Sequence, residues 1–172
     1  MCRCVCTCSL AFLIAIHAGA ASNGPSAKKP TSGVFAVLRE SVKEKDVLPL
    51  KDGEALLVHR HRYLKAGDKE PPRYVVVRRR PDVTLDLIGE PRAIKQGGEV
   101  MGILLTLQPK AAQTLERLTT AHLDKHVAIV LGGEIVTVHR VRTVIKNGDV
   151  QITNCTPGAA AYLLEQLKRE WK

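Results

Sequence analysis

Three histidines have the spacing that comes nearest to a metal site in this sequence. His122 and His126 are four residues apart, as two ligands on one helix face would be. His139 is the third histidine, which folding could bring near them. No glutamate follows His122 in the H-E-x-x-H manner, however, and the predicted helix ends before His126 begins a strand. We therefore expect solvated or packed histidines, and we predict no metal and no other cofactor.

A second group of histidines lies at residues 59–62, where His and Arg alternate. In a strand this alternation places His59 and His61 on one face and Arg60 and Arg62 on the other, and one face must be exposed to water. Two interpretations follow. One is a pH-responsive or anion-binding strip, and the other, which we favour, is an ordinary exposed strand edge.

Nucleophilic chemistry has one candidate, Cys155, which precedes a predicted helix whose N-terminus would lower the pKa of the thiol. A cysteine nucleophile also needs a histidine in contact, and we favour a buried thiol without a catalytic role. The sequence contains no G-x-S-x-G motif of serine hydrolases. The remaining cysteines are Cys2, Cys4, Cys6 and Cys8. We predict that the protein is not an enzyme.

Arginines form the strongest charged cluster of the chain, which has 26 Lys and Arg against 17 Asp and Glu. The cluster comprises Arg73, Arg78, Arg79 and Arg80. Such a run attracts phosphates or acidic polymers. Nucleic acid is not expected, because only Tyr74 lies near enough in sequence to stack on bases. An exposed edge strand that its charges protect from aggregation is the simpler interpretation.

The first 33 residues are predicted to precede the fold. Arg3, a short apolar stretch and a run of small residues have the order of a secretory signal peptide, which we assign to residues 1–21 with cleavage after Ala20 or Ala21. Residues 22–33 are rich in Ser, Pro, Lys and Gly and predict a flexible linker. Later apolar runs are too short to cross a membrane, so we expect a soluble protein exported to the periplasm or another extracytoplasmic space.

Hydrophobic periodicity divides the rest of the 172-residue chain into two regions. Residues 34–98 predict a β-rich region that pairs with itself or extends the next sheet. Residues 99–172 predict the order β-α-β-β-β-α, with helices that begin near Pro109 and after Thr156. The predicted strands lie at 54–64, 73–79, 83–88, 100–107, 126–131, 134–138 and 149–153. The predicted class is α+β, a mostly antiparallel sheet with two helices on one face.

Two glycine-containing dipeptides predict the turns of the C-terminal region. Gly132-Gly133 is typical of a two-residue hairpin between strands 126–131 and 134–138. Asn147-Gly148 predicts a second hairpin, after an extended arm at residues 139–145.

The C-terminal region resembles the head subdomain of the first periplasmic domain of SecD, a membrane subunit that assists protein export. The resemblance covers residues 99–168. It rests on Leu118-Thr119 at a helix end, the strand 128–131, the turn Gly132-Gly133, the exposed strand 136–141, Gly148, Gln151-Ile152 and the closing helix. The family's Asp-Gly turn and the Ala-Pro of its exposed strand are replaced here by Gly132-Gly133 and His139-Arg140. SecD also has transmembrane helices, on which its proton-coupled work depends, whereas we expect none in this protein. The resemblance therefore implies a free-standing head-like module without the translocase motor.

Three functional hypotheses remain open at this stage. The first is a non-enzymatic extracytoplasmic module that binds an export component or an exported chain by strand addition at the arm 139–145. The second is a binder of acidic envelope polymers through the arginine cluster, and the third is a small exported enzyme of unknown chemistry. The candidate interaction residues are Arg73, Arg78, Arg79 and Arg80 of the cluster and His139, Arg140, Val141 and Arg142 of the arm.

Overall fold

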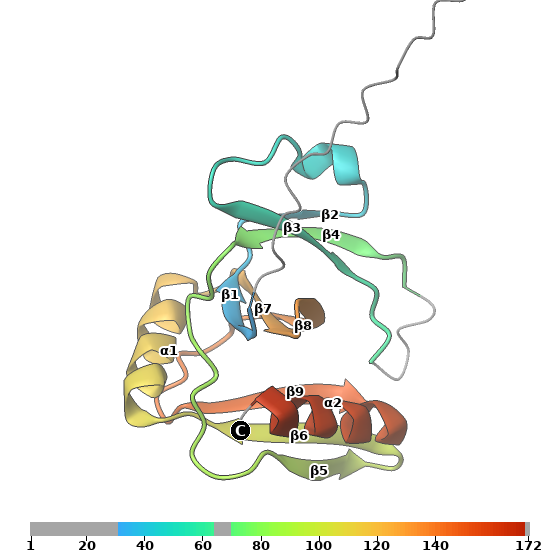
Figure 1. Ribbon diagram of the computed structural model, residues 1–172, viewed down its shortest axis with the longest axis vertical. Helices are drawn as coiled ribbons and strands as arrows, with labels where there is room; N and C mark the ends of the chain where they lie inside the picture. The colour runs from blue at the N-terminus through green and yellow to red at the C-terminus, as the bar shows by residue number, and fades with distance from the viewer. Residues whose placement is uncertain (1–30, 64–69, 171–172) are drawn as a thin grey trace, which may run out of the picture.

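A computed structural model describes residues 31–63 and 70–170 of the chain (Figure 1). The predicted signal peptide and most of the predicted linker lie outside these residues. The described part contains the following elements in order: β1 (Gly33–Ala36), β2 (Arg39–Ser41), the 3-10 helix η1 (Glu44–Val47), β3 (Glu54–His59), β4 (Arg73–Arg78), β5 (Arg92–Gly97), β6 (Val100–Thr106), α1 (Pro109–Ala121), β7 (His126–Leu131), β8 (Glu134–Arg140), β9 (Asp149–Cys155) and α2 (Pro157–Glu170). The α+β class and the predicted β-α-β-β-β-α order are confirmed.

The strands form three separate antiparallel sheets, whereas the sequence predicted one sheet in the C-terminal region and a β-rich region that pairs with itself or extends that sheet. The central sheet has the order β1-β7-β8, the upper sheet β2-β4-β3 and the lower sheet β5-β6-β9. Figure 1 shows the central sheet between the other two, with α1 beside it and α2 in front of the lower sheet.

The turn at Asn147-Gly148 does not form the predicted hairpin. β9 pairs with β6, and Gln151 lies opposite Leu104 in that ladder. Gly148 has a φ of +72°, and its carbonyl accepts a hydrogen bond of 3.0 Å from the N–H of Leu107 at the end of β6. A Cβ at position 148 would meet the Cβ of Ala112 in α1 at 2.5 Å. Position 148 therefore requires glycine so that the chain can pass α1 and reach the lower sheet.

The predicted strand at residues 83–88 is instead an extended connection between two sheets. Val83 forms a β-bridge with Val34 of β1, and Leu87 forms one with Leu107, just after β6. The predicted alternation holds, since both residues are buried. No strand forms because the two ends of the segment donate and accept hydrogen bonds in different sheets.

Two hydrophobic cores lie on opposite faces of the central sheet. In β7, Val127, Ile129 and Leu131 face the core that also contains buried residues of α1, α2, β6 and β9. Ala128 and Val130 face a second core, which the upper sheet closes with Leu57, Val75 and Val77. Five of the six β7 residues are buried as a result, and the strand reads as a continuous apolar run.

The two helices begin where their sequences predict. Pro109 occupies the first turn of α1, where its missing N–H has no helical partner to lose. At the start of α2, the N–H of Ala159 donates a 3.2 Å hydrogen bond to the Thr156 hydroxyl, the predicted cap. Leu163 and Leu167 of α2 point into the first core. No helix within the described residues has the length and apolarity that a membrane crossing requires.

Strand pairing runs across the predicted division at residues 98 and 99. Gly98 and Glu99 form the turn between β5 and β6, which pair from Arg92 opposite Leu104 to Gly97 opposite Val100, and Gly97 and Gly98 both have positive φ values. β1, which precedes that division, pairs with β7, which follows it. Residues of both predicted regions therefore share the first core.

We predict that Val130→Ala lowers the free energy of unfolding by about 2 kcal/mol, because it opens a cavity between the central and upper sheets. Val130 is fully buried, whereas Val42 is 53% exposed and provides the same substitution on the surface. Val42→Ala is expected to change stability by less than about 0.5 kcal/mol. Urea denaturation of both variants measures the difference, and equal losses would contradict burial as the cause.

Candidate functional site

A groove of about 670 Å³ lies where β8 and β9 border the space between the central and lower sheets. β8 is the last strand of the central sheet and β9 the last strand of the lower sheet. Each strand therefore has one edge without a strand partner in its own sheet. Backbone N–H and C=O groups on such edges can pair with an added strand.

The segment that follows β8 closes one side of this groove and is fixed to the turn before β7. The N–H of Val141 donates to the carbonyl of Lys125, and the N–H of Asp124 donates to the carbonyl of Val141, both at 2.8 Å. Further along, the N–H of Ile145 donates to the hydroxyl of Thr119 in α1 at 3.1 Å. These bonds hold the groove open between the two sheets.

The groove has an apolar floor and a polar rim. Floor residues come from the first core and from α1, namely Val34, Leu115, Val127 and Ile129. The polar side chains on its lining are His139, Arg140, Arg142, Thr143, Asp149, Gln151, Thr153 and Asn154. An extended polypeptide fits this chemistry, because it offers apolar side chains and unpaired backbone groups together.

The four candidate residues of the predicted arm all line the groove, but they do not form a free strand. Val141 is buried, with 6% of its surface exposed, and both of its backbone groups are already bonded. The prediction that residues 139–145 form a freely pairing arm is therefore corrected, because β8 ends at Arg140. Arg140 pairs with the Asp124 carboxylate at 3.2 Å, and Arg142 is exposed.

His139 lies half-buried on the groove wall. Its Nε2 is 3.1 Å from the hydroxyl of Thr137 on the same strand. Burial lowers the pKa of His139, which favours the neutral ring. The imidazole is thus a polar, uncharged group of the rim at neutral pH.

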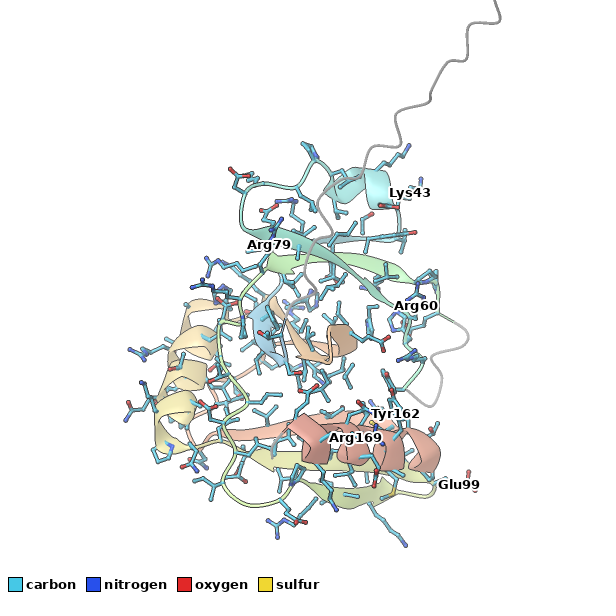
Figure 2. All side chains as sticks on the ribbon, in the orientation of Figure 1. Lys43, Arg60, Arg79, Glu99, Tyr162 and Arg169 are labelled. Carbon is cyan, nitrogen blue, oxygen red and sulfur yellow. The ribbon has the colours of Figure 1, made fainter. Side chains whose placement is uncertain are left out.

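The arginine cluster lies away from the groove, along β4 and just beyond it. Arg73 approaches the carboxylate of Glu40 at 3.8 Å, and Arg78 pairs with Asp82 at 2.8 Å. Arg79 donates from Nε to a backbone carbonyl of β3 at 3.2 Å, and Figure 2 shows it at the end of the upper sheet opposite Arg60. Two of the four charges are therefore locally compensated, while Arg80 is exposed.

The histidines with metal-like spacing do not converge. His122 follows the end of α1, and its Nδ1 lies 2.9 Å from the carbonyl of Leu118. His126 instead approaches the carboxylate of Glu40 with its Nδ1 at 2.6 Å. Across residues 31–63 and 70–170, no three His, Cys, Asp or Glu side chains gather as metal ligands would.

His59 and His61 differ from the expected exposed edge, since they are 3% and 5% exposed. The rings pack with their centroids 3.9 Å apart. Arg60 and Arg62 are exposed, so the predicted alternation holds and the face exposed to water is that of the arginines. Strand β3 contacts β8, and His59 lies beside the backbone of Val136 in β8.

Cys155 has the environment of an unreactive thiol. It is fully buried in the first core, and burial raises its pKa above the ordinary value. The raised pKa disfavours the thiolate that a cysteine nucleophile requires.

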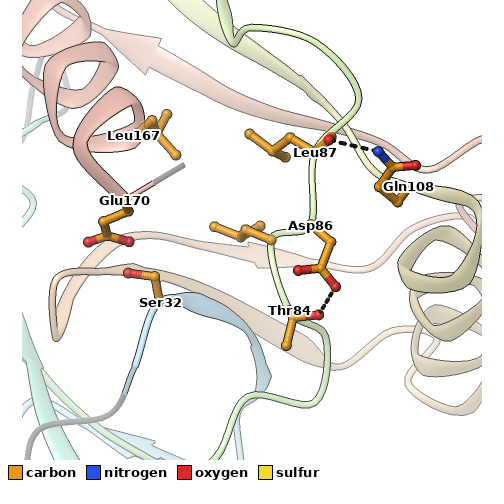
Figure 3. A pocket seen from close by; sticks show the side chains of 8 residues that line it. Ser32, Thr84, Asp86, Leu87, Gln108, Leu167 and Glu170 are labelled. Carbon is orange, nitrogen blue, oxygen red and sulfur yellow. Dashed lines mark hydrogen bonds between the residues drawn. The ribbon is translucent and has the colours of Figure 1, made fainter. Parts of the chain in front are cut away.

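A second pocket of about 490 Å³ lies between residues 84–87 and the end of α2 (Figure 3). Its polar groups largely satisfy one another or the backbone. The Thr84 hydroxyl donates to Asp86 at 2.7 Å, and the Gln108 amide donates to the Leu87 carbonyl at 3.2 Å. The first groove is the better candidate site, because its walls retain strand edges.

The contribution of β9 to the groove is the part that sequence reasoning missed. The sequence predicts residues 149–153 as the hairpin partner of the preceding strand, whereas they pair with β6. The signal lies in Gly148, whose close approach to α1 becomes evident only when the helix is placed.

We predict that Thr119→Val destabilises the protein by about 1 kcal/mol, because it leaves the half-buried N–H of Ile145 without an acceptor. Thr120→Val is the matched control: the Thr120 hydroxyl is exposed and bonds only to the helix carbonyl of Glu116. Urea denaturation of the two variants tests the difference. A Thr119→Val variant as stable as Thr120→Val would contradict the anchoring role of this bond.

Part of the chain is similar to known proteins. The family model of the SecDF P1 head subdomain matches residues 57–169. A structure of SecDF, described as a membrane component that enhances protein export, is 26% identical over 52% of this chain and 40% of that chain, with a TM-score of 0.46. A crystal structure of SecDF in a super-membrane-facing form is 30% identical over 52% of this chain and 12% of that chain, with a TM-score of 0.45. The chain thus spans less than half the length of either protein, and no curated protein matches it.

Proposed function

This chain belongs to the SecDF P1 head subdomain family, and on that premise we propose that it is a non-enzymatic protein-interaction module that binds extended segments of exported polypeptides in the groove between β8 and β9. The observation that carries the proposal is that residues of two end strands, β8 and β9, line one groove over an apolar floor. Strand addition gives affinity through main-chain hydrogen bonds and tolerates many sequences, which suits a module that meets many different exported chains.

The chemistry of the described side chains supports binding over catalysis. The Cys155 thiol has a raised pKa and lies in the core. His122 and His126 each contact a separate partner at a different place in the fold. No described group has the paired nucleophile and base that covalent catalysis requires.

An extracytoplasmic location follows from the same proposal. The relatives of known structure include a membrane component that enhances protein export. A head module that meets exported chains works on the side of the membrane where those chains emerge. The expected signal peptide at residues 1–21 agrees with this location and lies outside the described residues.

Photocrosslinking tests the groove directly. We expect benzoylphenylalanine at position 143, on the groove wall, to crosslink to a permanently unfolded probe such as reduced and carboxymethylated lactalbumin. The matched control carries the same crosslinker at Arg117, an exposed position on α1 that does not line the groove. Gel electrophoresis and mass spectrometry identify the product. Equal crosslinking from both positions, or none from position 143, would contradict the proposal.

Acidic envelope polymers remain the second candidate partner, because Arg79 and Arg80 have no carboxylate within ion-pair distance among the described residues. We expect Arg79→Gln with Arg80→Gln to leave polypeptide crosslinking at position 143 unchanged, since both residues lie outside the groove. Binding of a polyanion such as heparin is the comparison measurement. Two results together would favour the arginine cluster as the functional surface. The double variant would lose both polypeptide binding and polyanion binding, and polyanion binding by the unmodified protein would decrease steeply with salt.

A further inference from the structure

The buried pair His59 and His61 is the least well satisfied polar cluster in the described structure. Among the described residues, both ring nitrogens of His59 and the Nε2 of His61 have no hydrogen-bond partner of good geometry, and the backbone of Val136 is the polar group that comes near His59. A buried donor without a partner costs about 1–3 kcal/mol, and an apolar side chain of similar volume at either position would avoid this cost. Such a pair therefore calls for an explanation other than stability.

The backbone is also specialised at this point. β3 ends at His59, and His61 has a φ of +55°, in the left-handed region that residues other than glycine rarely adopt. This conformation turns the chain. The imidazole ring of His61 lies against that of His59, and the two ring planes are tilted by 43°. The left-handed backbone conformation of His61 and the unpaired ring nitrogens of both histidines thus occur together within residues 59–61.

The charges around the pair make it sensitive to protons. Arg73 on β4 lies opposite His59 in the ladder, and His139 on β8 is also near, so both disfavour a proton on His59. The Nδ1 of His61 lies 3.5 Å from the carboxylate of Glu70. Burial first, then the neighbouring charges of His61 and Arg73, lower the pKa of His59 to about 4.

The position of the pair links it to the groove. The end of β3 packs against β8, and His59 lies beside the backbone of Val136 in that strand. Val136 lies at a β-bulge, where the β7–β8 register shifts between Ile129 and Val130. The same strand continues through His139 and Arg140 along the groove wall.

We propose that His59, packed against the ring of His61, forms an acid-sensitive latch between β3 and β8. At neutral pH the His59 ring is uncharged and packed. As the pH falls, the opened form takes up a proton on His59 more readily than the packed form does, so the end of β3 opens away from β8 more often. In the groove proposed above, this opening loosens the wall that β8 forms.

The sign and size of the effect follow from proton linkage. The pKa of His59 is lowered in the packed form, so its contribution to stability is complete above pH 6.5 and decreases as the pH falls toward 4. With an ordinary pKa of 6.5 and a packed pKa of about 4, the opening equilibrium rises roughly 30-fold between pH 7.5 and pH 5.0 from His59 alone.

Hydrogen exchange of the full chain, corrected for the intrinsic pH dependence of exchange, tests the latch without any peptide ligand. We expect amides of β8 to exchange roughly 30-fold faster through opening at pH 5.0 than at pH 7.5, while amides of β6 keep their protection. In His59→Gln, which keeps a polar side chain but takes up no proton, the acid-induced increase should disappear. His122→Gln, at the end of α1, is the matched control and should retain it.

The outcomes separate the latch from the proposed peptide site. Unchanged β8 exchange at pH 5.0, an equal increase in β6, or an acid response that persists in His59→Gln would each overturn the latch and leave the groove proposal untouched. If His59→Gln does not fold, an NMR titration of the wild-type histidine rings decides the question. A native pKa for His59 near 6.5 overturns the latch, and a pKa far below 6.5 supports it.

Discussion

Burial of β7 on both faces is the constraint on which the rest of this structure depends. A strand with apolar side chains on both faces must be covered twice, once by each of two cores. The upper sheet supplies one cover, and the helices with the lower sheet supply the other. Because β1 and β8 pair with the two edges of β7, the position of this strand also sets the positions of both neighbours.

This arrangement separates the central and lower sheets at one side and leaves the groove there. The lower sheet covers the first core with β6 and β9, but β9 does not pair with β8. The connecting segment is held by hydrogen bonds to Lys125, Asp124 and Thr119, so it spans the gap without filling it. Two strand edges and an apolar floor are consequently brought together from parts of the chain that are far apart in sequence.

The upper sheet has a different role, because it covers the second core and also carries the buried histidines. Leu57 of β3 packs into that core, and His59 lies two residues further along the same face. The histidine pair thus lies at the end of the hydrophobic interface between β3 and β8. At that end, polar imidazole rings take the place of apolar side chains. Such a site couples the packing of β3 against β8 to proton uptake by His59, because burial lowers the pKa of this ring.

The sequence by itself determined the elements whose signals are local. Pro109, Thr156 and the helical spacing of leucines located both helices, and Gly132-Gly133 located the β7–β8 hairpin. The resemblance at residues 99–168 pointed to the family that the family model then identified over residues 57–169. Among the candidate residues, His139, Arg140, Val141 and Arg142 do line the groove, although the free arm they were expected to form is absent.

Only the tertiary structure decided which strands meet. Periodicity reports which side of a segment is buried, but it does not report which edge that segment pairs with, because those hydrogen bonds join residues distant in the chain. The pairing of β9 with β6, the division into three sheets and the covering of His59 and His61 by β8 are all decided in this way. The alternation at residues 59–62 showed two faces, and the packing of β3 against β8 selected the histidine face for burial.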